Sequence, residues 1–161
     1  MTDSHALALF RNSMASLASG VAVLTARHED GRPCGLAATA VAAYSASPPS
    51  VLASVDHSSR CHPALVACQH FGLHILRTDN EPMAQVFAGK GEDKFAGLDW
   101  GWDLDVPRLS DTLAYLRLRR AEAFAYYDHT VVIGDVESGE MAGGEPLLYA
   151  RRRMDWLLAE G

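Results

Sequence analysis

One stretch of the sequence, 35-GLAATAVAAYS-45, consists almost entirely of small and apolar residues. A strand with so little side-chain bulk packs weakly by itself, which indicates that something large lies against it. Small side chains would let a flat ligand approach the backbone, whose N–H groups could then bind the polar edge of that ligand. Packing of the strand against a helix is the alternative interpretation. The residues of this stretch leave both open.

Runs of strand-forming residues lie on both sides of this stretch. Val21–Thr25 precedes it across a hairpin-type turn at 29-EDG-31, because Asp-Gly readily supplies the positive φ that such turns need. The double proline at 48–49 is expected to end the stretch. Further strands are predicted at Ser50–Val55, Phe71–Leu76, Ala114–Arg120, Thr130–Glu137 and Pro146–Arg152.

Helical patterns are few and short. Apolar residues recur at helical spacing within residues 4–18, and shorter helices are predicted near Pro63–Cys68 and Glu81–Phe87. Residues 97–111 look irregular. Because strands and helices do not alternate regularly, a doubly wound sheet is disfavoured. We expect a mainly β protein with short helices, built as a compact antiparallel barrel in a single domain over residues 1–161.

The composition is that of an ordinary globular protein. The chain has 161 residues, of which 48% are hydrophobic and 21% charged, and its net charge is −6. Without a long basic tract, a nucleic-acid partner is not expected. Three cysteines without C-x-x-C spacing suit reduced thiols rather than a disulfide framework. The sequence shows no signal-peptide pattern and no apolar run approaching about 18 residues, so a cytoplasmic protein without a membrane span is expected.

A second stretch, 56-DHSSRCHP-63, runs from a predicted strand end into a predicted helix start. Its hydroxyls and backbone N–H groups make it a plausible seat for a phosphate group, and an ordinary capped turn is the alternative. Motifs for a nucleophile, a P-loop, a zinc protease or a dinucleotide fingerprint are missing from the sequence. His70 and His74 would share one strand face, but no Cys or carboxylate stands at ligand spacing beside them, so no metal site is predicted.

In the order and spacing of its motifs the chain resembles the flavin reductase family. This family comprises the small reductase components of two-component flavin monooxygenases, of the 4-hydroxyphenylacetate type. The resemblance covers nearly the whole chain and is carried by short motifs that are individually weak. They are 20-GVAVLT-25, 38-ATAV-41 with the double proline after it, 56–63, 71–76, 87-FAG-89, 93-DKF-95, 128-DHT-130, 134-GDV-136 and 146-PLLY-149.

The resemblance implies an FMN-binding split β-barrel that forms a homodimer. It implies an NAD(P)H:flavin oxidoreductase that binds FMN or FAD, takes hydride from NADH or NADPH, and supplies reduced flavin to an oxygenase partner. It also implies that four small residues line the flavin, and that one of them, Thr39, forms a hydrogen bond with it. These four are Ala38, Thr39, Ala40 and Val41.

The same resemblance implies roles for three further groups of residues. The ribityl and phosphate groups are assigned to Asp56, Ser58, Ser59 and His62. The loop that closes over the phosphate or adenylate side is assigned to Phe87, Gly89, Lys94 and Phe95. His129 corresponds to the histidine beside the flavin ring and the nicotinamide, and it is the predicted catalytic residue.

Two positions depart from the family pattern, because Ala37 and Ala42 stand where many relatives carry a hydroxyl or thiol side chain. This could weaken flavin binding, or leave it to backbone groups. Two alternatives to a reductase therefore stay open. One is a flavoprotein of the same fold that carries electrons or stores flavin without turnover, and the other is an interaction domain that has lost its cofactor.

Overall fold

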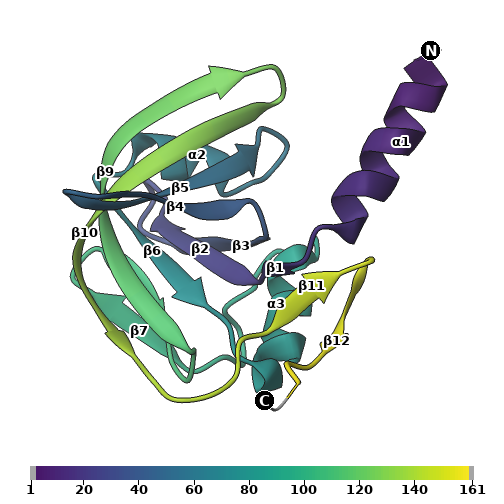
Figure 1. The fold of residues 1–161 in the computed structure, drawn as a ribbon. Coiled ribbons are helices and arrows are strands. Elements are labelled where there is room, and N and C mark those ends of the chain that lie inside the picture. Colours follow the sequence, from purple (N-terminus) through teal and green to yellow (C-terminus); the bar gives the residue numbers. More distant parts are fainter. Residues whose placement is uncertain (1–2, 160–161) are drawn as a thin grey trace.

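The computed structural model describes residues 3–159, and its main element is one antiparallel sheet of seven strands (Figure 1). In the order in which they are hydrogen-bonded, the strands are β3 (Pro33–Ala38), β2 (Ala22–Arg27), β6 (His70–Ile75), β9 (Ala114–Tyr126), β10 (His129–Met141), β5 (Pro49–Asp56) and β4 (Val41–Ala46). The sheet curls round its core, and β3 and β4 are the two ends of this order. The barrel is therefore split along one seam, and the predicted mainly β, split-barrel class is confirmed.

The barrel core forms because apolar side chains alternate along the strands. Phe71, Leu73 and Leu118 are at most 2% exposed and pack together inside the barrel. Gly134 allows this packing, since a Cβ at that position would lie 2.7 Å from the ring of Phe71. Burial of each large apolar side chain contributes about 1.5–3 kcal/mol, so this cluster is the main stabilising element of the sheet.

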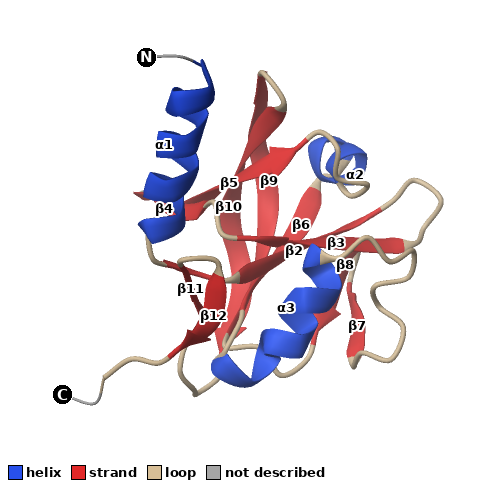
Figure 2. Ribbon diagram, turned by 90° about the vertical axis from the view of Figure 1, so that its right-hand side faces the viewer, coloured by secondary structure: helices blue, strands red, loops and turns tan. Residues whose placement is uncertain are grey.

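A second core lies on the other side of β2. Val23, Leu76 and Phe87 are at most 1% exposed there and pack with further residues from the C-terminal part of the chain. The strand β2 is thus covered on both faces, which explains its nearly continuous run of apolar residues. The helix α3 (Glu81–Ala88) lies across this side of the sheet, next to β3 (Figure 2).

The N-terminal helix α1 (Asp3–Ser16) is separate from both cores. It has no buried residue and projects away from the barrel (Figure 1). The structure also contains α2 (His62–Ala67) and the 3₁₀ turn η1 (Thr78–Asn80), which leads into α3. None of the described helices has the length and apolar character needed to cross a membrane.

Three sequence-based predictions are corrected by the structure. The small-residue stretch is two strands, because the chain turns at Thr39 and Ala40. The double proline does end this stretch, as predicted, since β4 stops at Ala46 and Pro49 begins β5 after a cis Ser47–Pro48 bond. Residues 97–111 are not irregular, and they contain the hairpin of β7 (Trp100–Asp103) and β8 (Val106–Leu109). The last predicted strand is only β11 (Leu148–Ala150), which pairs with β1 (Ser19–Gly20) and β12 (Arg153–Trp156).

Candidate functional site

A groove of about 1370 Å³ opens on the side of the barrel where β3 meets α3. Three segments form it: strand β3, the turn after β5, and the loop that follows α3. Several family-derived residues lie in it together, although they are far apart in the sequence. They are Asp56, Ser58, Ser59, Phe87, Gly89, Lys94 and Phe95.

The strand wall of the groove is formed by residues 33–37 of β3, with Gly35 and Ala37 as its small residues. A Cβ at Gly35 would lie 2.6 Å from the ring of Phe87, so this position accepts only glycine without displacing that ring. Both interpretations of the small-residue stretch therefore apply to β3. It packs against a helix through Gly35, and its backbone also borders a space large enough for a ligand.

The turn after β5 exposes hydroxyl groups toward the groove. The Asp56 carboxylate accepts a hydrogen bond from Ser58 N at 2.7 Å, and this bond lowers the pKa of Asp56. A backbone bond from Ser59 N to Asp56 O at 3.0 Å closes the same turn. With its backbone fixed in this way, the turn can present the Ser58 and Ser59 side chains to a polar ligand.

Two cations hold the loop after α3 in place. Lys94 Nζ donates to Phe87 O at 2.7 Å, and Arg60 Nη2 donates to the carbonyl oxygens of Lys90 and Gly91 at 2.5 Å each. Burial, followed by the charge of Arg60, lowers the pKa of Lys94. These cations therefore already have main-chain partners, and contact between them and a phosphate stays a prediction.

An aromatic wall continues from α3 to the β7–β8 hairpin. The ring centroids of Phe87 and Phe95 are 5.3 Å apart, those of Phe95 and Trp100 are 5.0 Å apart, and those of Trp100 and Trp102 are 5.4 Å apart, all edge to face. Trp100 lines the groove and was missed from the sequence. The alternation of Trp100, Gly101, Trp102 and Asp103 was the available signal, because it places both tryptophans on one face of a strand.

Residues 38–41 begin at the last residue of β3 and do not line the groove itself. Ala38 is buried in the barrel core, and Val41 packs against that core from β4. Thr39 and Ala40 are exposed in the connection between β3 and β4. Their assignment to the flavin stays a prediction, and the structure places them at the end of the strand wall.

The two predicted histidines, His62 and His129, do not line the groove, but each adjoins a residue that does, Cys61 and Asp56 respectively. His62 Nε2 is 2.8 Å from the buried Thr130 hydroxyl, and His57 Nε2 is 3.0 Å from the same atom. Burial, followed by the charge of His57, lowers the pKa of His62. His129 is paired with Asp56 across β5 and β10, and its Nδ1 lies 2.8 Å from the Asp128 carboxylate. Because Asp56 lines the groove, His129 is one strand away from it.

Two thiols form part of the groove floor. Cys34 and Cys61 are both buried and lie against each other. Burial and the hydrogen bond to Cys34 raise the pKa of the Cys61 thiol well above its ordinary value. A thiol that is protonated is a poor nucleophile, so Cys61 is not suited to covalent catalysis. Within residues 3–159, no group of three or more His, Cys, Asp or Glu side chains is arranged to hold a metal ion.

Comparison with known proteins gives a consistent result. The model of the flavin reductase like domain family matches residues 14–158. The chain is 37% identical over 142 residues to FMN reductase (NADH) SmoA of Agrobacterium fabrum, covering 88% of this chain and 80% of that protein. It is 36% identical over 144 residues to the reductase component of 4-nitrophenol 4-monooxygenase/4-nitrocatechol 2-monooxygenase of Rhodococcus opacus, covering 89% and 77%. The crystal structure of a flavin reductase domain protein from Arthrobacter sp. FB24 superimposes with a TM-score of 0.90 at 30% identity, covering 96% and 98%.

Proposed function

The chain belongs to the flavin reductase like domain family, and from that premise we propose that it is an NAD(P)H:flavin oxidoreductase that supplies reduced FMN or FAD. The observation that carries the proposal is the groove, which brings together a strand of small residues, a turn with exposed hydroxyls and a loop held by two cations. The similar proteins named for NADH-dependent FMN reduction support the same reaction for this chain.

The residues of the groove fit a flavin nucleotide. Gly35 and Ala37 give the strand wall little side-chain bulk at two of its positions, where a flat ring system could approach the backbone. Ser58 and Ser59 offer hydroxyl groups for a ribityl chain or phosphate, and Lys94 retains N–H donors beyond the one that it gives to Phe87 O. The volume of about 1370 Å³ exceeds the usual range of small-molecule pockets, so it leaves room for a dinucleotide.

Hydride acceptance is the chemistry that a flavin supplies when it is bound. The residues of this chain would bind and orient the reacting rings, and holding them in contact removes much of the entropic barrier. The strand wall and the aromatic wall border the space in which these rings would be held. No side chain is required as a nucleophile, in agreement with the protonated state of the Cys61 thiol.

His129 is the proposed catalytic residue. Its Nδ1 is bonded to Asp128, so Nε2 is the nitrogen that could hold or pass a proton at the nicotinamide side. The proposed cofactor contacts are the twelve other positions that the family resemblance assigns to the flavin. Among them, residues 38–41 lie at the end of the strand wall, where a bound flavin would contact them. If His129→Ala leaves the hydride-transfer rate and the NADH affinity unchanged, the role of His129 is wrong.

The exposed apolar surface supports a homodimer as part of this proposal. Phe10 in α1 is 62% exposed, Leu17 just after that helix is 61% exposed, and Tyr44 on the edge strand β4 is 61% exposed. Burial of such side chains against a second copy would stabilise both chains. We expect Phe10→Glu to lower the molar mass in sedimentation, whereas Leu104→Glu on the exposed β7–β8 turn should not change it.

An oxygenase that consumes the reduced flavin is the proposed partner, because one similar protein is the reductase component of a monooxygenase. A cytoplasmic location is part of the same proposal, and the three free thiols are consistent with it. The electron-carrier and interaction-domain alternatives are not favoured, since the similar protein from Agrobacterium is named as an NADH-oxidising enzyme.

The test is the oxidation of NADH and NADPH by the purified protein, with and without FMN, FAD or riboflavin. Flavin-dependent loss of the absorbance of the reduced nicotinamide is expected, and the rates rank the cofactors. Tight flavin binding without turnover would support the carrier instead. Failure to bind any flavin would support the interaction domain.

A further inference from the structure

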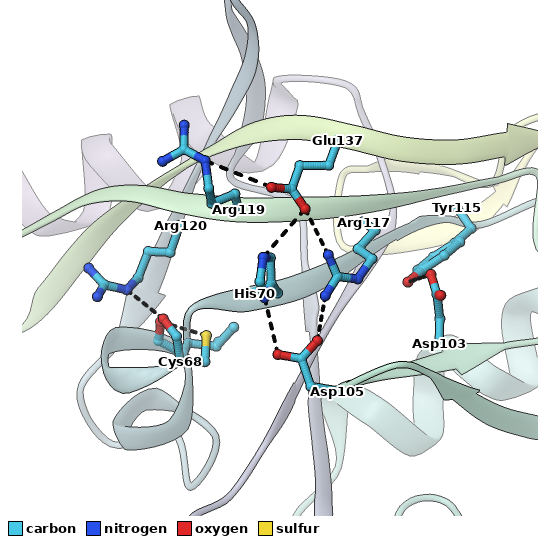
Figure 3. Close-up of polar contacts among 10 residues, drawn as sticks. Cys68, His70, Asp103, Asp105, Tyr115, Arg117, Arg119, Arg120 and Glu137 are labelled. Atoms are coloured by element: carbon cyan, nitrogen blue, oxygen red, sulfur yellow. Dashed lines mark hydrogen bonds and ion pairs between the residues drawn. The ribbon is translucent and has the colours of Figure 1, made fainter.

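Four charged side chains on the outer face of the main sheet form a closed ring, shown in Figure 3. His70 of β6 lies between two carboxylates, with Nδ1 3.1 Å from Asp105 Oδ2 and Nε2 3.4 Å from Glu137 Oε2. Arg117 of β9 lies between the same two carboxylates, at 2.5 Å from Asp105 and 2.7 Å from Glu137. We call these four side chains the charge ring.

Within the charge ring, His70 Nδ1 is hydrogen-bonded to Asp105, and Nε2 lies at ion-pair distance from Glu137. Arg117 contacts the same two carboxylates, so His70 and Arg117 together link Asp105 to Glu137. Arg119 of β9, at 3.8 Å from Glu137, and its partner Asp135 lie on the same side.

The charge ring holds the tip of the β7–β8 hairpin. Asp105 lies in the turn of that hairpin, whereas His70, Arg117 and Glu137 belong to the main sheet. The Arg117 side chain is only 8% exposed, and its Nε is buried without a hydrogen-bond partner among residues 3–159. Its charge is therefore matched by Asp105 and Glu137 alone, and displacement of Asp105 would leave a buried cation half paired.

The other end of the hairpin reaches the groove. Trp100 lines the groove, and its backbone partner Leu109 donates its N–H to His74 Nε2 at 3.0 Å. A hairpin of two strands is only marginally stable by itself, so its position depends on what it is docked to. The charge ring and the hydrogen bond from Tyr115 to Asp103 hold its tip, and His74 holds its base.

From these contacts we propose that His70 is a positioning residue for the nucleotide groove. It acts through Asp105 and the β7–β8 hairpin on Trp100, so ligand affinity weakens when the contact between His70 and Asp105 is lost. Catalysis itself is unaffected, because His70 touches no part of the groove. This inference rests on the proposed function for the identity of the ligand, but the docking of the hairpin does not depend on it.

The test compares wild-type protein with His70→Gln and Asp105→Asn, with Arg153→Gln at an exposed ion pair as a control. Amide hydrogen exchange within residues 100–109 should become several-fold faster in both variants and unchanged in the control. This measurement needs neither flavin nor turnover.

Flavin and NADH titrations provide the second arm. The dissociation constant for FMN, followed by tryptophan quenching, and the KM for NADH should rise about three- to tenfold in both variants, with kcat unchanged. Unchanged exchange and affinity in both variants would overturn the proposal. Absence of NADH oxidation by wild-type protein would instead refute the proposed function, while the exchange data still decide the docking.

Discussion

The groove and the outer face under the β7–β8 hairpin use polar side chains in opposite ways. On the outer face, His74 is completely buried, with Nδ1 at 3.3 Å from Val23 O and Nε2 accepting from Leu109 N. Thr25 donates to Pro107 O at 2.6 Å on the same face. In the groove, by contrast, the Ser58 side chain is exposed, and Arg60 is bonded only to main-chain carbonyls.

The difference separates structural from functional polar groups. Buried polar groups are nearly always paired, and among the buried side-chain atoms of residues 3–159 only Arg117 Nε lacks a partner on the outer face, so this face does not depend on a ligand. In the groove the backbone hydrogen bonds are formed, but the side-chain hydroxyls and the remaining N–H donors are available to bind a ligand. We therefore expect substitutions on the outer face to change stability first, and substitutions in the groove to change affinity first.

The largest effect is expected for His74→Leu. Leucine fills a similar volume but leaves Leu109 N and Val23 O buried without their partner, and each such group costs about 1–3 kcal/mol. We expect the free energy of unfolding to fall by about 3 kcal/mol in urea denaturation at pH 7. The control His28→Leu changes a half-buried histidine with no such role, and a loss as large there would contradict the assignment.

The second prediction concerns pH. Burial lowers the pKa of His74 from 6.5 to about 3, so the folded protein keeps this ring neutral. Below pH 6.5 the unfolded chain binds a proton that the folded chain does not, and stability falls with decreasing pH down to about pH 3. Between pH 6.5 and pH 5 this amounts to about 2 kcal/mol.

His74→Leu lacks this contribution, so its stability difference from wild type should shrink as the pH falls. Measurements above pH 5 avoid most of the effect of carboxylates such as Asp105, whose pKa lies below 3.8. Parallel stability curves for the two proteins between pH 7 and pH 5 would show that His74 is not the titrating group.

The third prediction moves to the groove. Arg60→Gln removes the guanidinium that holds the carbonyls of Lys90 and Gly91, so the loop after α3 is no longer fixed. We expect FMN affinity to fall about tenfold, equivalent to about 1.4 kcal/mol, with less than about 1 kcal/mol change in stability. Flavin fluorescence titration gives the affinity. Arg60→Lys should recover part of the lost affinity. If Arg60→Gln instead lowers the stability and leaves the FMN affinity unchanged, Arg60 is a structural residue and not a groove residue.

The smallest effect is expected for Arg119→Gln. Arg119 is also on the outer face and pairs with Asp135 and Glu137, but its side chain is 52% exposed. Exposed ion pairs contribute little, so the loss should stay below about 1 kcal/mol. A much larger loss of unfolding free energy in urea denaturation would show that ion pairing, rather than burial, is what stabilises the outer face.

The sequence predicted the strands whose apolar residues alternate or run continuously, because burial alone decides them. It did not predict the hairpin at 100–109, where Gly101 and Pro107 obscure the alternation and docking to Thr25 and His74 stabilises the strands. Those partners are distant in sequence, so no local pattern shows them. The pairing of His70 with Asp105 and Glu137 was missed for the same reason.

The candidate site was predicted unevenly. The turn at 56–59 and the loop residues around Phe87 and Lys94 do share one groove, because their motifs carry the polar and aromatic groups that line it. Within the small-residue stretch, the groove lies at Gly35–Ala37, three residues before the predicted contacts. Which face of a strand a side chain occupies depends on where that strand ends. The run of alanines around Thr39 gives no sign of the turn, so the sequence could not show which residues face the groove.

The long β9–β10 hairpin has a consequence for the order of folding. Its two strands have 13 residues each and are joined by only two residues, so their pairing closes a very short loop. The pairing of β2 with β6 joins residues about 50 positions apart and pays a larger entropic cost. We expect β9 and β10 to pair early in the folding transition state and to serve as the template on which β5 and β6 assemble. The seam between β3 and β4, whose strands lie at opposite ends of the sheet order, would then be the last part of the barrel to form.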